Sequence, residues 1–213
     1  MELVAVEDLP PRNYQELKAF YDENPHPNVR PRPNDVLEQA VQTHVFTVFR
    51  DAKAKICGAA GIFDYVDSDY FEIGATIVLT GGFGLQKLLI AIRLLSISSN
   101  TSGDVPVFTI IKKSGAEKSH SSIEKMGFVL WPEPDSKMIE DRCSTLNILP
   151  PQDVNYYIFE WTPEHLRNLA ETFLRFYDQS KLSRNGRTVS LRFDHRWLDR
   201  PDVLPWIRSL AEN

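Results

Sequence analysis

The sequence predicts an α/β protein in which helices flank a mixed β-sheet. The first indication is the stretch Glu72–Arg93, which passes from a β-branched apolar run through three glycines into a helical pattern. The second is the order of the surrounding elements. Strands joined by short turns precede this stretch and should pair antiparallel, whereas the strand that follows its helix should pair parallel. The sheet is therefore expected to be antiparallel first and parallel in its middle.

Upstream of the central stretch, we expect a first strand, two short helices and a three-stranded meander. A loop rich in Pro and Asn separates the two helices. Gly58 and Gly61 lie inside one strand and indicate a bulge or a close neighbour. The expected elements are strand 2–6, helix 14–21, helix 34–42, strand 44–50, strand 54–65 and strand 70–79.

Downstream of the central helix, strands and helices continue to alternate. Thr162 followed by Pro163 marks a helix start, because Thr caps a helix and Pro suits its first position. The segment 132–155 has little periodicity and is expected to be an irregular insertion. The expected elements are the central helix 84–98, strand 107–112, helix 116–126, strand 128–131, strand 156–161, helix 162–178, a turn at 183–186, strand 189–193 and helix 203–210.

Composition bounds the class of protein. The chain has 213 residues, 42% apolar and 25% charged, as in a soluble globular domain. Two cysteines, Cys57 and Cys143, form neither a disulfide framework nor a metal-ligand set, so no metal is expected. The N-terminal residues do not have the pattern of a signal peptide, and no run reaches the length of a membrane span. We therefore expect a cytoplasmic protein, a monomer or a homodimer, with no membrane partner.

The net charge of −5 argues against general nucleic-acid binding by the whole chain. Charge is uneven, however, because the segment 181–208 carries seven basic residues and three acidic ones. This segment is either a solvated surface with local ion pairs or a nucleic-acid interface. The first is the simpler interpretation, and a nucleic-acid partner is not favoured.

The glycine turn of the central stretch suits an anion. A helix begins with unpaired N–H groups, and glycines leave room for a phosphate to approach them. Two common phosphate motifs are absent, however. Gly84-Leu85-Gln86 is not the Gly-Lys-Ser/Thr of a P-loop, and Lys87 stands where a dinucleotide fingerprint starting at Gly82 needs its third glycine. These residues alone leave open a phosphate site or a plain strand-to-helix turn.

Three pieces of sequence resemble the GNAT superfamily of acyl-CoA-dependent N-acyltransferases. They are Glu72-Ile73-Gly74, the glycine turn with its helix start at 82–89, and Ser122-Ile123-Glu124-Lys125-Met126-Gly127-Phe128. The resemblance covers about residues 45–131. It implies a splayed central sheet and transfer of an acetyl group from acetyl-CoA to an amine on a small molecule or a protein. It also implies an acyl-CoA-binding domain at 1–161, with 162–213 as a helix–strand–helix extension packed on it.

The resemblance implies acetyl-CoA as co-substrate. Its pantetheine arm would bond to the strand edge at Ile77, Val78 and Leu79. Its pyrophosphate would lie on the glycine turn and helix start, formed by Gly81, Gly82, Phe83, Gly84, Leu85, Gln86 and Lys87. Two positions depart from the family pattern. Gly81 replaces the usual Arg or Gln, and Ile123 replaces a tyrosine that often protonates the leaving thiolate. A binding module without turnover is therefore the alternative.

Candidate catalytic residues follow from the same comparison. Glu72 occupies a position that carries a carboxylate in many relatives, and it is the candidate base; otherwise it is a charge paired with a lysine. His120 is the candidate acid, with Ser119 and Ser122 as alternatives, unless it is simply an exposed polar residue. Tyr65 and Tyr70 are expected to shape an acceptor pocket, to which segments 14–42 and 132–155 would contribute.

Overall fold

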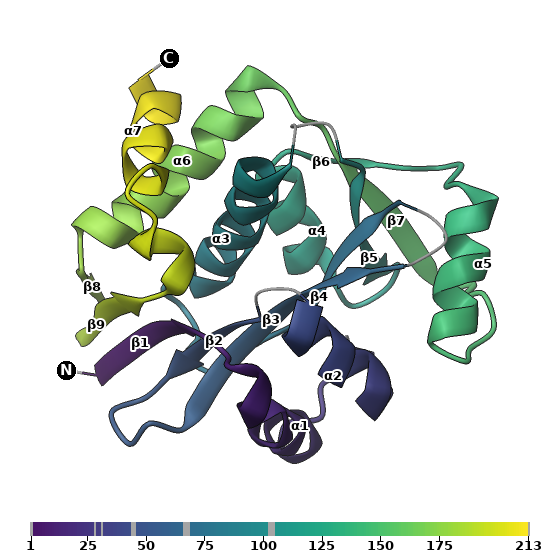
Figure 1. Cartoon of the computed structure of the whole chain (residues 1–213), viewed down its shortest axis with the longest axis horizontal. Coiled ribbons are helices and arrows are strands. Elements are labelled where there is room, and N and C mark those ends of the chain that lie inside the picture. The colour runs from purple at the N-terminus through teal and green to yellow at the C-terminus, as the bar shows by residue number, and fades with distance from the viewer. Residues whose placement is uncertain are drawn as a thin grey trace.

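The computed structural model describes residues 2–27, 29–30, 32–43, 46–65, 69–101 and 105–212. In these residues one mixed β-sheet carries helices on both faces (Figure 1). The strands are β1 Glu2–Asp8, β2 Thr47–Arg50, β3 Ile56–Asp64, β4 Phe71–Val78, β5 Val107–Lys112, β6 Phe128–Leu130, β7 Val154–Phe159, β8 Lys181–Arg184 and β9 Arg187–Asp194. The helices are α1 Tyr14–Glu23, α2 Asn34–Thr43, α3 Leu85–Asn100, α4 Glu117–Glu124, α5 Ser136–Thr145, α6 Pro163–Asp178 and α7 Val203–Glu212.

The sheet confirms the predicted fold class. Its strand order is β6-β7-β5-β4-β3-β2-β1-β9-β8. The pair β4–β5, which α3 connects, is parallel, and the meander β2–β3–β4 is antiparallel. Of the predicted strand 44–50, His44 and Val45 lie outside the described residues, as does most of the turn before β4. The close neighbour predicted at Gly61 is the ring of Phe46, which a Cβ at Gly61 would meet at 2.3 Å.

The prediction that 132–155 is irregular was wrong. This segment contains α5, and the Asp135 side chain caps it by accepting bonds from the N–H groups of Lys137 at 2.8 Å and Met138 at 3.2 Å. Met138 is fully buried, but most of α5 is polar, so its apolar face is too narrow to give a clear helical period. Strand β8 was missed for a similar reason, because three of its four residues are exposed.

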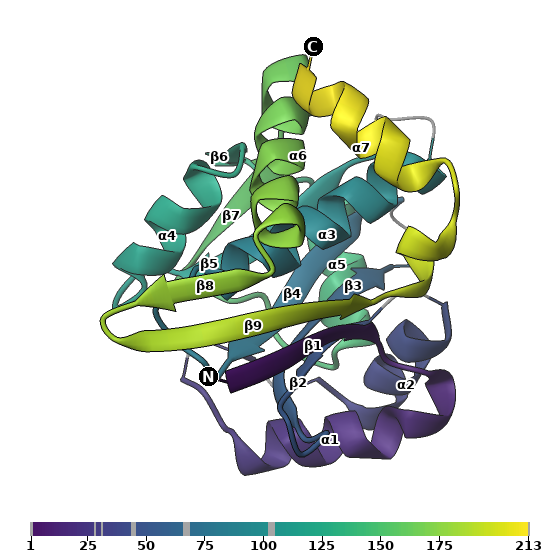
Figure 2. The ribbon, with the colours of Figure 1, turned by 90° about the vertical axis from the view of Figure 1, so that its left-hand side faces the viewer.

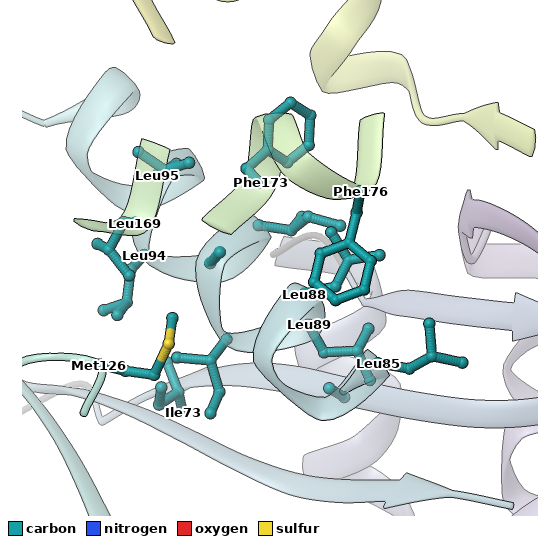
Figure 3. Packing of buried hydrophobic residues seen from close by; sticks show 14 of the residues in the cluster. Ile73, Leu85, Leu88, Leu89, Leu94, Leu95, Met126, Leu169, Phe173 and Phe176 are labelled. Carbon is teal, nitrogen blue, oxygen red and sulfur yellow. The ribbon is translucent and has the colours of Figure 1, made fainter. Parts of the chain in front are cut away.

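Two apolar cores lie on opposite faces of the sheet. One contains α3, α4, α6 and α7, and the other contains α1, α2 and α5. Helix α3 is buried nearly all round, because the sheet lies on one side of it and α6 on the other. Figure 3 shows Phe173 and Phe176 of α6 lying over leucines of α3, including Leu88. This explains why the sequence of α3 is apolar on more than one face.

Residues 162–213 take part in the same sheet and core as the residues before them. Strand β9 pairs parallel with β1, with Val4 opposite Leu191, and β8 forms the edge beyond it (Figure 2). A buried polar contact adds to this pairing, since His195 Nε2 lies 2.8 Å from Asp8 Oδ1 and the N–H of Arg196 donates to Asp8 Oδ2 at 2.8 Å. The N-terminal strand therefore lies between β2 and β9 and joins the C-terminal segment to the rest of the sheet.

We predict that Phe173→Ala lowers the free energy of unfolding by about 3–5 kcal/mol, because it leaves a cavity between α6 and α3. Exposed Glu171 lies on the same helix, so Glu171→Ala should change it by less than about 0.5 kcal/mol. Denaturant unfolding followed by circular dichroism measures both. Equal stabilities of the two variants would contradict the packing described here, and a separate early transition would show that 162–213 unfolds by itself.

Candidate active site

Strand β4 contains a bulge at its centre. Gly74 pairs with Gly61, but the next pair is Ile77 with Ala59, so two residues of β4 lie opposite one of β3. Ala75 in this bulge has a φ of +50°, in the left-handed region that residues with a Cβ seldom adopt. Side-chain alternation changes here. Ile73 belongs to the core beneath α3, whereas Ala75 and Ile77 belong to the core of α1 and α2.

Arg93 of α3 binds the backbone around this bulge. Its Nη1 donates to the carbonyl of Gly61 at 3.0 Å and to that of Gly74 at 3.2 Å, and its Nη2 donates to Thr76 Oγ1 at 3.1 Å. The residue is 1% exposed, and burial lowers the pKa of Arg93 to about 9, so the guanidinium remains charged at neutral pH. No carboxylate among the described residues pairs with it.

Beyond the start of β4, the strands β4 and β5 separate. They pair only at Phe71 with Val107 and at Glu72 with Phe108. A cavity of about 970 Å³ lies against the residues that follow, and it is lined by 72–79 of β4 and 109–112 of β5. Parts of α1, α3, α4, α5 and the loop before α2 also contribute to its wall. The unpaired edge of β4, toward which the N–H of Val78 points, therefore faces an open space large enough for a ligand, whereas the N–H of Leu79 donates to the carbonyl of Cys57 at 2.9 Å.

The glycine turn lies at one end of this edge. Gly82 and Gly84 have φ values of +93° and +76°, and Gly84 is the N-cap of α3. Two arginines from the β8–β9 hairpin flank the turn. Arg184 Nη1 donates to the carbonyl of Gly82 at 2.6 Å, and the guanidinium of Arg187 lies 5.5 Å from the ring centre of Phe83. Sequence inspection missed these arginines, because they are about a hundred residues from the turn.

Glu72 lies at the other end, buried among cationic donors. Arg142 Nε donates to Glu72 Oε2 at 2.8 Å, Arg32 forms an ion pair with Oε1, and the hydroxyl of Tyr65 donates to Oε2. Burial alone would raise the pKa of Glu72, but Arg142, Arg32 and these hydrogen bonds lower it to about 2. Glu72 therefore pairs with two arginines and not with the lysine that the sequence suggested. A carboxylate with this pKa is a weak base at neutral pH.

The ion pair between Arg32 and Glu72 also explains why a glycine occupies position 74. A Cβ on Gly74 would lie 3.0 Å from both Arg32 Nη2 and Glu72 Oε1. The absence of a side chain at this position leaves room for the Arg32–Glu72 ion pair against the strand.

Four of the other candidate residues, His120, Ser122, Tyr65 and Tyr70, do not line the cavity. His120 is held by Tyr157, whose hydroxyl is 2.8 Å from its Nδ1, and by the carbonyl of Lys112, 2.8 Å from its Nε2. Tyr70 stacks on Trp131, with ring centres 5.6 Å apart. Tyr65 lies behind Glu72, while Ser119 and Ile123 do line the cavity.

Sequence inspection missed Tyr21, Arg32, Arg93 and Arg142, which also line the cavity. The Tyr21 hydroxyl donates to the carbonyl of Ala75 in the bulge. Burial raises the pKa of Tyr21 well above its ordinary value, so this hydroxyl stays protonated at neutral pH. The sequence did predict that segments 14–42 and 132–155 would contribute to an acceptor pocket. These two segments contain Tyr21, Arg32 and Arg142, three of the four residues.

Comparison with known proteins identifies the fold. No protein-family model matches the sequence, and no curated protein matches it. Solved structures do. An N-acetyltransferase from Staphylococcus aureus Mu50 has a TM-score of 0.53 at 12% identity, over 74% of this chain and 97% of that one. Rv2747 from Mycobacterium tuberculosis in complex with CoA has a TM-score of 0.52 at 17% identity, over 72% and 97%.

A second S. aureus Mu50 structure, an acetyltransferase of the GNAT family, has a TM-score of 0.51 at 12% identity, over 75% of this chain and 99% of that one. The chain therefore has the GNAT fold, as its motifs indicated. In the described part of the chain, no helix is long and apolar enough to cross a membrane, and no cluster of His, Cys, Asp and Glu has the form of a metal site.

Glu72 should make folding stability depend on acid pH. Its folded pKa of about 2 lies below the ordinary glutamate value of 4.5, so its contribution is complete above pH 4.5 and is lost as the pH falls through 2. Denaturant titrations measure how far the free energy of unfolding falls between pH 6 and pH 3. This fall should be about 2 kcal/mol smaller in Glu72→Gln than in wild type. The exposed control Glu171→Gln should keep the wild-type slope. An unchanged slope in Glu72→Gln would contradict the low pKa.

Proposed function

We propose that the protein is an N-acetyltransferase that moves an acetyl group from acetyl-CoA to an amine. The observation that carries this proposal is the separation of β4 and β5 after Glu72, which leaves one edge of β4 unpaired beside a cavity. An extended chain with amide groups can bond to such an edge as an added strand. The pantetheine arm of CoA has this chemistry, and Ile77, Val78 and Leu79 are the residues that would receive it.

The phosphate groups of acetyl-CoA would lie at the glycine turn. The N–H groups of Leu85 and Gln86 lie at the start of α3, where the macrodipole favours an anion, whereas that of Lys87 donates to the carbonyl of Gly84 at 2.9 Å. Gly81 supplies no cationic side chain. Arg184 lies beside the same turn through its bond to Gly82, and we assign to it the phosphate contact that Gly81 cannot make.

In the reaction, the neutral amine attacks the thioester carbonyl, a C–N bond forms, and the C–S bond breaks to release the CoA thiolate. The low pKa of Glu72 argues for a positioning role, with the amine proton leaving through water in the cavity. Ile123 cannot protonate the thiolate. Tyr21 is a protonated hydroxyl at the bulge of β4, and we propose it as the proton donor in place of His120.

One observation favours a second function, a binding module without turnover. Glu72 is neutralised by Arg32 and Arg142, and Ile123 stands where the family has a tyrosine, so neither expected proton-transfer group is in its usual state. Nucleic-acid binding gains no support. Most basic side chains of 181–208 already have partners, among them the ion pairs Arg187–Glu2, Arg196–Asp8 and Arg208–Asp178.

Calorimetric titration with acetyl-CoA, followed by an assay of CoA release with a panel of amines, tests the proposal. The enzyme account predicts binding at micromolar cofactor and release of CoA that depends on an amine. Binding without release for any amine would support the binding module. Absence of binding at millimolar acetyl-CoA would reject both.

Arg184→Ala should raise the dissociation constant of acetyl-CoA about three- to tenfold, because it removes a charged contact with the phosphates. The effect should shrink as salt is raised, since a phosphate contact at an exposed site is screened. Arg200→Ala is the matched control, since Arg200 is another exposed arginine of the C-terminal segment and pairs with Asp202. Equal affinities of the two variants would place the phosphates elsewhere.

Tyr21→Phe should lower kcat about 10- to 100-fold at neutral pH and leave the dissociation constant of acetyl-CoA within about twofold. Loss of the proton donor, with retention of the ring, is the physical reason. Tyr177→Phe, on α6 against Phe173, is the control and should retain wild-type turnover. A normal kcat in Tyr21→Phe would return the acid role to His120, Ser119 or solvent.

A further inference from the structure

Among the buried wall residues that the structure describes, the cavity has more positive than negative charge. Arg32, Arg93 and Arg142 line it, and Glu72 is the one acidic side chain among its fully buried wall residues that the structure describes. The side chains of Arg32 and Arg142 are each 4% exposed. Arg32 and Arg142 share the carboxylate of Glu72, which leaves one positive charge in excess there, and Arg93, which bonds to backbone oxygens and Thr76, adds a second to the same wall. Buried charges in proteins are normally paired, so this excess indicates a negatively charged ligand.

Several donors of these arginines are also unused. Nε and Nη1 of Arg32 and Nη1 of Arg142 are buried and have no hydrogen-bond partner. Leaving such a donor unsatisfied is costly, and native structures nearly always provide a partner. Glu72 cannot provide it, because its two oxygens already accept bonds from Arg32, Arg142 and Tyr65. The partner therefore has to come from outside the described chain.

The phosphates of acetyl-CoA are not that partner. They are assigned to the glycine turn, which follows Leu79, whereas Arg32 and Arg142 bind Glu72 at the opposite end of β4. Leu79 comes seven positions after Glu72, a span of roughly 20 Å along an extended chain. Arg32 and Arg142 come from the loop before α2 and from α5, on the face of the sheet where Tyr21 meets the bulge.

We propose that the acceptor is an amine that carries a carboxylate, as an amino acid does, and that Arg32 and Arg142 bind the carboxylate. This rests on the proposed function, because it assigns the second substrate of the same site. A guanidinium N–H donates a charge-assisted hydrogen bond to a carboxylate oxygen, and Nε and Nη1 of Arg32 and Nη1 of Arg142 are the donors without a partner. With the carboxylate held there, the amine of the same molecule points along β4 toward the thioester.

The same charge disfavours cationic acceptors. A polyamine would bring further ammonium groups beside Arg32, Arg93 and Arg142, and like charges in a buried site repel strongly. Simple alkylamines would leave the buried donors unsatisfied. Both classes should be poor acceptors.

The test compares matched compounds. Binding of the twenty amino acids, their amides, the amines formed by their decarboxylation, spermidine and phosphoethanolamine is measured by calorimetry with and without CoA, and acetyl transfer to each is measured by CoA release. We expect at least one amino acid to exceed its amide and its decarboxylated amine by tenfold or more in affinity. Equal affinity for acid and amide, or a preference for spermidine or phosphoethanolamine, would overturn the carboxylate assignment.

Arg32→Lys provides the sharper variant. A lysine keeps a positive charge near Glu72 but removes the free Nε–H and Nη1–H donors. We expect it to weaken binding of the preferred amino acid about tenfold or more and to leave CoA affinity within about twofold. Arg200→Lys is the exposed control and should bind both as wild type does. Unchanged amino-acid affinity in a folded Arg32→Lys protein would overturn the proposal.

Measurements of binding and of turnover distinguish the proposed N-acetyltransferase function from the proposed class of acceptor. CoA binding and transfer to amines without a preference for carboxylates would leave the N-acetyltransferase function intact and reject the acceptor class. Amino-acid binding that depends on Arg32, without CoA binding, would support the carboxylate site and reject the enzyme. Failure of every compound in the panel to bind, in a protein that binds CoA, would also reject the carboxylate site.

Discussion

The bonds from Arg93 to the backbone around the bulge in β4 are the interaction on which the site depends. A single guanidinium from α3 binds carbonyl oxygens of Gly61 and Gly74 on two neighbouring strands, together with the hydroxyl of Thr76. These contacts hold β4 in a bulged conformation with Ala75 in the left-handed region. The bulge redirects β4 away from β5, so the unpaired edge and the cavity beside it follow from this one arrangement.

The second constraint is the burial of Glu72. A carboxylate in this position is stable as an anion because Arg32 and Arg142 come to it from separate segments, the loop before α2 and helix α5. The pair therefore ties the two acceptor-side segments to β4. The same pairing makes Glu72 a poor proton acceptor and leaves the site with excess positive charge. One local arrangement thus accounts both for the loss of the expected base and for the proposed class of acceptor.

Local sequence signals predicted the fold well and the site only in part. The strand, the glycine turn and α3 were predictable because each has a local pattern, and the parallel β4–β5 pair followed from their order. Helix α5 was not predictable, because its apolar face is narrow and it depends on the cap by Asp135. The bulge at Ala75 was also hidden, since an alanine gives no sign of a left-handed conformation.

The side chains of the site come together only through tertiary structure. Arg32 lies 40 residues from Glu72 and Arg142 lies 70 residues from it, and no periodic pattern connects them. Sequence inspection placed Glu72 and the edge at 77–79 in the candidate site because they belong to the central stretch itself. It assigned Tyr65, Tyr70 and His120 to the site from their neighbours in sequence, whereas their side chains contact Glu72, Trp131 and Tyr157.

The central claim is that the unpaired edge of β4 receives acetyl-CoA. Amide hydrogen exchange read at single residues, with and without acetyl-CoA, tests it most directly. The account predicts that binding slows exchange at Val78, whose N–H points to the unpaired edge, and at Leu85 and Gln86 at the start of α3, while the paired strand β9 is unaffected. Protection confined to other regions, or unchanged exchange along β4 when the cofactor is bound, would contradict the account.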